Sequence, residues 1–194
     1  MPRNRRYVTP AILLAALANG LLQLLVTTLE LPLFLDTVGT AAVAITFGPV
    51  AGTVTGLLSN LASQLFQGFP GHLWPFAPVN MATGLTLGLI ARRYDIRKAQ
   101  VIAVSVVVVT LLNALLGTIV VTLVFSGITS QSVDYLVTAL VLTGRSIFSA
   151  AFLARIPINF VDKSIAILVA LAIRKALLSR RRQSDEFVAE NRRN

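Results

Sequence analysis

Long apolar stretches separated by short polar or turn-forming segments extend along most of this chain. The first runs from Thr9 to Leu29, and a longer one lies between Asp36 and Phe66. A helix needs about 20 apolar residues to cross a hydrocarbon core of ~30 Å, so these stretches predict membrane-spanning helices. The second stretch contains Gly48-Pro49, where proline lacks a backbone donor and disfavours helix at the residue before it. We therefore divide it into two helices.

The same pattern along the rest of the chain predicts an all-α integral membrane protein, a bundle of six transmembrane helices. The second helix is short, and we expect it to be tilted or partly unwound, which a bilayer tolerates only where protein covers the backbone. The predicted crossings are residues 9–29, 36–47, 50–66, 75–91, 99–125 and 158–178.

Basic residues set the orientation of these helices. Basic residues close to the ends of membrane spans are retained on the cytoplasmic side, so all the basic clusters of the chain should share that side. This predicts cytoplasmic N and C termini and a cytoplasmic turn near position 95, with an even number of crossings between successive clusters. The clusters are Arg3, Arg5 and Arg6, then Arg92, Arg93, Arg97 and Lys98, and finally Arg174, Lys175, Arg180, Arg181, Arg182, Arg192 and Arg193.

One further apolar segment, Asp134 to Ala154, has Arg145 near its centre. A seventh crossing here would place either the middle basic cluster or the tail on the wrong side. A mid-bilayer arginine would also cost at least ~2.5 kcal/mol unless paired. We therefore predict a helix or helical hairpin packed at the outer face. The domain organisation is then a single membrane domain, residues 1–178, and a basic, frayed cytoplasmic tail, residues 179–194.

Composition supports the membrane interpretation over a soluble one. Hydrophobic residues make up 55% of the chain and charged residues 13%, and the mean hydropathy is +0.77. A formal charge of +9 could suggest nucleic-acid binding, but the charge gathers at span ends, which membrane topology explains better. Because the chain has no cysteine, disulfides and thiolate metal sites are excluded.

Two rows of small residues predict close helix packing. Gly48, Gly52 and Gly56 recur every four residues in the third predicted crossing, and Gly84 and Gly88 do so in the fourth. Such rows most often serve helix packing. Each row ends in polar residues toward the outer side, so we also predict a polar level there, formed by Asn60, Gln64 and Asn80.

The first crossing has a stripe of small residues toward its inner half. It either packs against another helix of the same chain or serves a partner protein that docks from the cytoplasmic side. The stripe consists of Ala11, Ala15 and Ala18.

The outer loops hold the remaining candidate residues. Trp74 is either a residue of the aromatic belt at the membrane interface or a cap over a ligand. His72 has no acidic or histidine neighbours at the spacing of metal ligands, so it is weak support for a metal site. The outer charges are either ordinary loop charges or part of a binding site; they are Arg145, Arg155 and Lys163 against Glu30, Asp36, Asp134 and Asp162. The chain lacks HExxH, GxSxG, a P-loop and a second histidine, so we expect no catalytic residues, no bound metal and no cofactor.

Three segments resemble the S components of energy-coupling factor (ECF) transporters. They are Leu33-Phe34-Leu35-Asp36-Thr37-Val38-Gly39-Thr40, then Phe47-Gly48-Pro49-Val50-Ala51-Gly52 with Gly56-Leu57-Leu58-Ser59-Asn60, and finally Pro157-Ile158-Asn159-Phe160-Val161-Asp162-Lys163. The resemblance implies a six-helix subunit of a bacterial or archaeal cell membrane. Such a subunit binds a vitamin or related micronutrient from outside and docks on a transmembrane coupling subunit with two ATPases.

The resemblance also implies roles for individual residues. Ala11 and Ala15 match the stripe that meets the coupling subunit in this family. The substrate site is implied at Asp36 to Thr40, His72, Trp74, Asn80, Asn159, Asp162 and Lys163; Arg145 is added from its charge alone, and Asn60 and Gln64 from their level in the membrane.

Two other functions remain open at this point. A membrane receptor could bind a small molecule without moving it, and a lipid-modifying enzyme is disfavoured by the missing catalytic groups. The sequence does not choose among riboflavin, thiamine precursors, pyridoxine and queuosine precursors.

Overall fold

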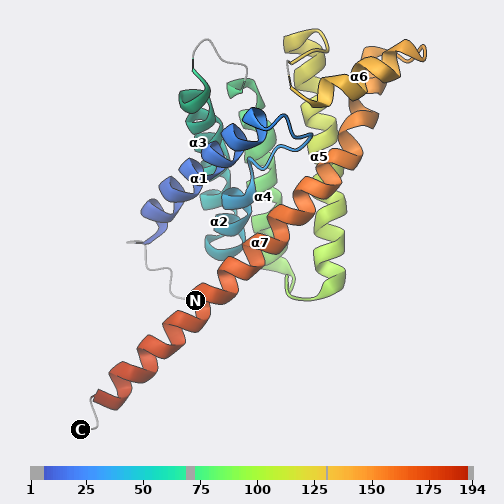
Figure 1. The fold of residues 1–194 in the computed structure, drawn as a ribbon. Helices are drawn as coiled ribbons and strands as arrows, with labels where there is room; N and C mark the ends of the chain where they lie inside the picture. The colour runs from blue at the N-terminus through green and yellow to red at the C-terminus, as the bar shows by residue number, and fades with distance from the viewer. Residues whose placement is uncertain (1–6, 69–72, 130, 192–194) are drawn as a thin grey trace.

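A computed structural model describes residues 7–68, 73–129 and 131–191. All regular secondary structure in the described part is helical, and this part contains no strand. Figure 1 shows a bundle crossed by one very long C-terminal helix. The elements are α1 (Val8–Thr28), α2 (Val38–Phe47), α3 (Pro49–Gln67), the 3-10 turn η2 (Trp74–Phe76), α4 (Ala77–Arg93), α5 (Ala99–Phe125), α6 (Val133–Leu142) and α7 (Ile147–Asn191).

The predicted break between α2 and α3 is confirmed. Gly48 ends α2 with φ of 98°, a conformation that L side chains rarely adopt, and Pro49 is the first residue of α3. Glycine permits this backbone conformation, and proline at the first helical position gives up a donor that has no partner within the helix anyway.

Helix α2 has only ten residues, about 15 Å of length, which is half of a bilayer core. Every residue from Val38 to Ile45 is buried, and the helix packs against α1, α3, α4 and α7. Protein therefore surrounds this short helix. A bilayer tolerates a short or partly unwound crossing only where protein covers it, and α2 meets this condition.

Helices α3 and α4 pack through their glycine rows. A Cβ at Gly56 would fall 2.5 Å from the carbonyl carbon of Asn80, and a Cβ at Gly52 would fall 2.8 Å from the carbonyl oxygen of Gly84. Gly88 approaches the backbone of Pro49 in the same way. The prediction that these rows bring two helices together is thus confirmed.

The segment from Asp134 to Ala154 is a helical hairpin, as predicted, but its second arm belongs to α7. Helix α7 begins at Ile147 and continues through Pro157, so the helix starts eleven residues before the predicted crossing at 158–178. It also continues past 178 to Asn191, where a frayed tail had been predicted. Arg145 lies in the exposed turn between α6 and α7.

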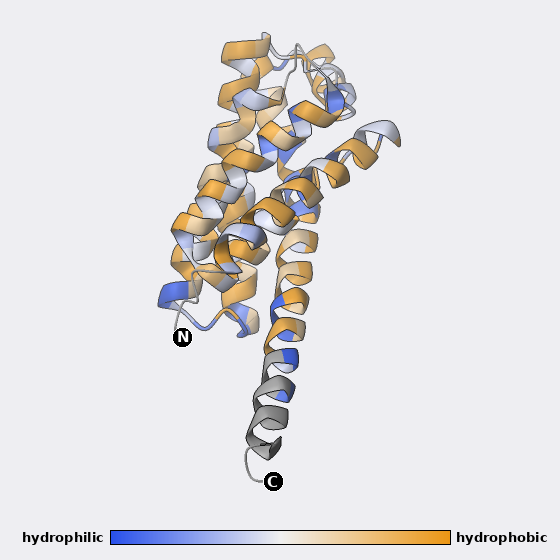
Figure 2. Cartoon of the chain, turned by 90° about the vertical axis from the view of Figure 1, so that its left-hand side faces the viewer, coloured by the Kyte–Doolittle hydropathy of each residue, from blue (hydrophilic) through white to orange (hydrophobic). Residues whose placement is uncertain are grey.

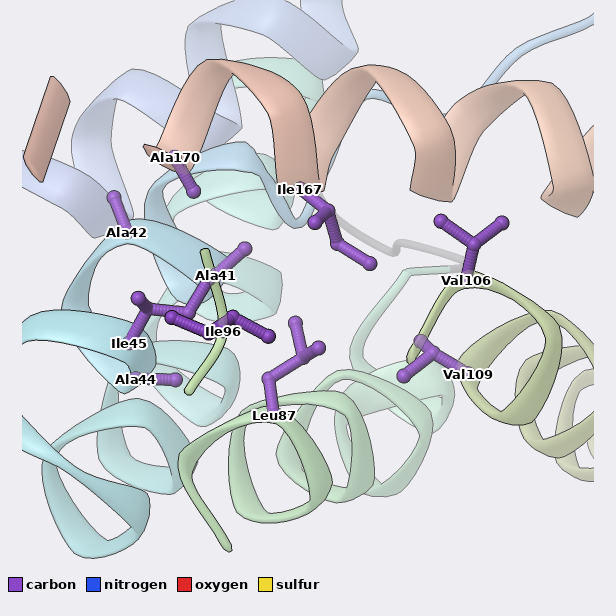
Figure 3. Packing of buried hydrophobic residues seen from close by; sticks show 10 residues of the cluster. All are labelled: Ala41, Ala42, Ala44, Ile45, Leu87, Ile96, Val106, Val109, Ile167 and Ala170. Atoms are coloured by element: carbon purple, nitrogen blue, oxygen red, sulfur yellow. The ribbon is translucent and has the colours of Figure 1, made fainter. Parts of the chain in front are cut away.

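Two apolar clusters stabilise the bundle. The larger joins α2, α4, α5 and α7 and includes Ala41, Leu87, Val109 and Ile167 (Figure 3). The smaller joins α6 to the first turns of α7. Along α7, the stretch between the two clusters carries Arg155, Asn159, Asp162 and Lys163, all buried. These four polar side chains therefore lie in the interior of the bundle, near both apolar clusters.

The outside of the bundle is apolar. Figure 2 shows hydrophobic residues along the sides of the helices and hydrophilic ones at the connection between α4 and α5. In the described residues, three helices are long and apolar enough to cross a membrane: α1, α5 and the part of α7 from Ile147 to Arg180. The start of α1, the α4–α5 connection and the C-terminal half of α7 lie toward one end of the bundle, here called the basic end; α6 lies at the opposite end, here called the α6 end (Figure 1).

The α4–α5 connection at the basic end is closed by an ion pair. The guanidinium of Arg97 donates from Nε to Asp95 Oδ1 at 2.9 Å and from Nη2 to Oδ2 at 3.0 Å. These hydrogen bonds lower the pKa of the Asp95 carboxyl to about 2. Both side chains are solvated, so the pair shapes the turn and contributes little to stability.

Candidate functional site

Three polar residues of α7 face the interior of the bundle one helical turn apart. Arg155, Asn159 and Lys163 follow one another at intervals of four, which places them on one side of a helix. They are 2%, 3% and 2% exposed. Buried charges are costly unless partners compensate them, so the contacts of each one matter.

Lys163 is held by three oxygen atoms. Its Nζ donates to Asp162 Oδ2 at 2.7 Å and to Thr37 Oγ1 at 2.8 Å, and it lies 3.6 Å from Asp36 Oδ1. Two carboxylates therefore share one ammonium, and the three side chains together carry a net charge of −1. We call Asp36, Asp162 and Lys163 the ionic trio.

Asp162 also holds the loop between α1 and α2. Its Oδ1 accepts from the backbone N–H of Leu35 at 2.7 Å and from that of Phe34 at 3.2 Å. Leu35 has φ of 48°, an uncommon conformation for this residue type that surrounding contacts must maintain. Asp162 therefore positions Phe34 and Asp36 at the wall of the site.

A chain of hydrogen bonds leads from Asp36 across α4 to α3. Asn80 donates from Nδ2 to Asp36 Oδ2 at 2.8 Å and also to Asn60 Oδ1. Asn60 in turn donates to the carbonyl of Leu73 at 2.7 Å. The predicted meeting of Asn60 and Asn80 is confirmed, and it connects the trio to the α3–η2 connection.

Asp36 and Asn80 border a small cavity of about 30 Å³, here called the inner chamber. A water-sized group needs about 10 to 15 Å³ by such a measure, so the chamber has room for about two. It lies between α1, the α1–α2 loop, α4, α5 and α7. Its polar lining includes Gln23, Asp36, Asn80, Asn113, Arg155 and Lys163.

A larger hollow of about 420 Å³, here called the outer hollow, lies at the α6 end. The last turns of α1, the α1–α2 loop, the α5–α6 connection and α6 form its walls. Gln23, Phe34 and Gln131 line both spaces. These three side chains therefore separate the inner chamber from the outer hollow.

Three residues around the inner chamber have buried polar atoms without a hydrogen-bond partner among the described residues. They are Gln23 Oε1, Asp36 Oδ1 and Arg155 Nη2. Buried polar groups are paired in most native structures, so unpaired ones gathered at one cavity call for a further partner. The chamber offers one acceptor from α1, one from the α1–α2 loop and one donor from α7.

The structure brings together four of the predicted site residues and leaves others outside. Asp36, Asn80, Asn159 and Lys163 line the inner chamber, and Asp162 touches it through Lys163. Asn60 lies one contact away. Gln64 binds the α3–η2 connection instead, with Nε2 donating to Gly68 O and Oε1 accepting from Leu73 N–H at 3.2 Å.

Three further predicted positions lie away from the chamber or outside the described residues. Trp74 is 60% exposed, and neither space is lined by it. Phe76, two residues later, lines the chamber and stacks on Phe125 with ring centroids 5.8 Å apart. Arg145 is exposed at the α6–α7 turn. His72 lies outside the described residues.

Thr40 belongs to a separate polar network in which α1, α2 and α3 meet. Asn19 donates from Nδ2 to Thr40 Oγ1 at 3.0 Å and to Ser59 Oγ at 2.8 Å, while its Oδ1 accepts from the N–H of Gly39 at 2.6 Å. All four residues are buried. Both polar atoms of the Asn19 side-chain amide therefore have hydrogen-bond partners, and the network stabilises the place where the three helices meet.

The alanine stripe of α1 is divided between the interior and the surface. Ala15 is half-buried and lies against Gly39, where an added Cβ would fall 2.9 Å from Ala15 Cβ. Ala11 is also half-buried, whereas Ala18 is exposed beside Leu14, Leu17 and Leu21. Part of the stripe therefore packs within the chain, and the exposed face of α1 is mostly leucine.

The sequence pattern alone did not identify most of the uncharged lining or the role of Arg155. Arg155 was counted only among the outer charges, although its spacing of four from Asn159 and of eight from Lys163 could have identified it. Gln23, Asn113 and Gln131 gave no comparable signal, since they lie on three different parts of the chain. Among the described residues, no group of three or more His, Cys, Asp or Glu side chains could hold a metal.

Comparison with known proteins gives one match. A family model described as "ECF transporter, substrate-specific component" matches residues 5–174. No curated protein and no solved structure matches the chain significantly.

Proposed function

The chain belongs to the substrate-specific components of ECF transporters, since the family match covers most of its length, and from this premise we propose that it captures a vitamin or related micronutrient from outside the cell. The observation that carries the proposal is the inner chamber, where three buried polar atoms from separate elements have no hydrogen-bond partner among the described residues. A few exact polar groups in an otherwise apolar bundle are typical of selective small-molecule sites.

The orientation in the membrane is part of the proposal. The basic residues of the α4–α5 connection and of α7 after Leu171 gather at the basic end, which we assign to the cytoplasm of a bacterial or archaeal cell. The outer hollow at the α6 end then opens to the outside. In this arrangement α1 to α5 and α7 provide six crossings, with α2 and its preceding loop forming a covered, partly unwound one.

The chain would work by binding and release and would need no catalytic group or cofactor of its own. A polar solute enters the outer hollow, passes Phe34, Gln23 and Gln131, and pairs with the groups around the inner chamber. Release to the cytoplasm requires a second state, and a partner can stabilise that state only by contacting it better than the first. We assign this role to a transmembrane coupling subunit with two ATPase subunits, docking on the exposed face of α1.

The proposal is tested by purifying the chain in detergent and identifying the small molecules that remain bound by mass spectrometry. The compound found is then supplied to cells expressing the chain with and without coupling and ATPase subunits. We expect uptake only with the complete set, together with co-purification of all subunits. Binding without uptake in the complete set would support a receptor instead, and turnover of a lipid by the purified chain would support an enzyme.

A further inference from the structure

We propose that the captured solute carries a carboxylate group and that Arg155 is the residue that binds it. This inference rests on the proposed capture function and adds the chemical class of the substrate. Its starting point is the environment of one guanidinium group in the wall of the inner chamber.

Arg155 is a buried cation without a counter-ion in contact. It is 2% exposed, yet none of the ion pairs among the described residues includes it. Nη1 makes a long hydrogen bond of 3.5 Å to the carbonyl of Ala151, and Nη2 has no hydrogen-bond partner among the described residues. Arginine keeps its charge at any physiological pH, so deprotonation does not relieve the cost of this burial.

Asp134, the acidic residue that acts electrostatically on Arg155, does not supply the missing partner. Asp134 attracts Arg155 electrostatically, but its oxygens already accept hydrogen bonds elsewhere. They bind the N–H of Thr129 at 2.6 Å, the hydroxyl of Thr129 at 3.1 Å and the N–H of Gln131 at 3.3 Å. Asp134 thus shapes the α5–α6 connection and leaves the guanidinium of Arg155 open toward the chamber.

The charges around the chamber are unevenly arranged. Counted by formal charge, the ionic trio carries −1 and Arg155 carries +1, so the chamber is neutral overall but has a negative and a positive side. An anionic group is favoured beside Arg155 and repelled by Asp36, whose Oδ1 lies 3.6 Å from the ammonium of Lys163. The site therefore both attracts an anion and orients it.

Charge and size favour a carboxylate over a phosphate. A phosphate group carries about −1.5 to −2 charges near neutral pH. Lys163, the other cation among the described residues that line the chamber, is already shared by two carboxylates. The inner chamber has room for about two water-sized groups, which matches the two oxygens of a carboxylate. The rest of the solute would occupy the outer hollow of about 420 Å³.

The experiment uses the full chain, purified and freed of bound solutes, and follows its thermal unfolding. The probe is a cell metabolite extract separated at pH 7 on a strong anion exchanger. We expect the stabilising compound in the fraction that the exchanger retains. Carbodiimide-coupled amidation of that fraction should abolish the stabilisation, whereas alkaline phosphatase should leave it unchanged.

Substitutions test whether Arg155 is the residue that binds the carboxylate. Arg155→Gln should weaken binding of the retained fraction by at least about tenfold, the loss expected for one charge-assisted hydrogen bond. Arg155→Lys keeps the charge without the planar fork and should bind with intermediate affinity. Arg93→Gln, an exposed arginine at the end of α4, is the matched control and should bind like the original chain.

Each contrary outcome has a defined meaning. If the stabilising compound passes through the exchanger, or if Arg155→Gln binds it unchanged, the carboxylate inference is wrong while the capture function stands. If phosphatase treatment removes the stabilisation, the ligand is a phosphate and the inference is also wrong. If no fraction stabilises the chain, the capture function itself fails. Should Arg155→Gln not fold, the amidation and exchanger results on the original chain still decide the question.

Discussion

Asp36 and Lys163 face each other at 3.6 Å in the interior of the bundle, one from the loop before α2 and the other from the middle of α7. Asp162 completes the contact from the residue next to Lys163. A buried ammonium shared by two carboxylates is stable only while all three are present. The ionic trio therefore couples the position of the α1–α2 loop to the charge of the site.

Removing the cation of the trio should strongly destabilise the protein. We expect Lys163→Met to lower the free energy of unfolding by about 3 to 5 kcal/mol, because it leaves two buried carboxylates without a counter-ion. Lys175→Met, an exposed site on the same helix, should change it by less than about 0.5 kcal/mol. Reversible denaturation in mixed micelles measures both, and equal small effects would contradict the role given to the trio.

The network around Asn19 should matter for stability independently of ligand binding. Asn19→Ala leaves the N–H of Gly39 without its acceptor and removes the donor to Thr40 and Ser59, so we expect a loss of about 1 to 3 kcal/mol. Thr28→Val, an exposed hydroxyl at the end of α1, serves as the control. A loss below 0.5 kcal/mol for Asn19→Ala, about the size expected of an exposed substitution, would refute this role.

The contact of α3 with α4 should reject even one added methyl group. Gly56→Ala brings a Cβ to 2.7 Å from the backbone nitrogen of Met81, so we expect a loss of about 1 to 3 kcal/mol. Gly117→Ala in α5 meets its nearest atom, Arg155 Nε, at 3.5 Å and should be close to neutral in the ligand-free protein. Unfolding midpoints that fall equally for both variants would speak against the glycine-row contact.

Docking of a partner on α1 is best tested at Ala18. Ala15 is a poor position for a bulky residue because it packs on Gly39 within the chain, whereas Ala18 is exposed. Ala18→Trp should abolish uptake and co-purification with the coupling subunit while leaving ligand-induced thermal stabilisation unchanged. Ala103→Trp on the exposed side of α5 is the control. Undiminished uptake with Ala18→Trp would rule out docking at this face.

Single cysteines can establish the orientation, since the natural chain has none. We expect Thr143→Cys, in the exposed α6–α7 turn, to react with a membrane-impermeant maleimide in intact cells. Tyr94→Cys, 64% exposed at the basic end, should react only after permeabilisation. The reverse pattern would invert the proposed topology and place the outer hollow on the cytoplasmic side.

Features that depend on short-range pattern were predictable from the sequence. The break at Gly48-Pro49 follows from backbone chemistry, and the glycine rows of α3 and α4 follow from a spacing of four in apolar helices. The helix boundaries near Pro157 were not predictable in this way. Pro157 by itself predicts the start of a helix, but the hairpin with α6 packs the turns before it and keeps them helical.

The sequence by itself determined that this is a helical membrane protein, because hydrophobicity, basic clusters and glycine spacing act locally along the chain. Only the tertiary structure decided which polar residues share a site. Gln23, Asp36, Asn80, Asn113 and Arg155 come from separate helices and loops, and their meeting depends on how α7 crosses the bundle. Buried polar groups select partners by distance in space, so the open guanidinium of Arg155 becomes visible only once every competing partner has been placed.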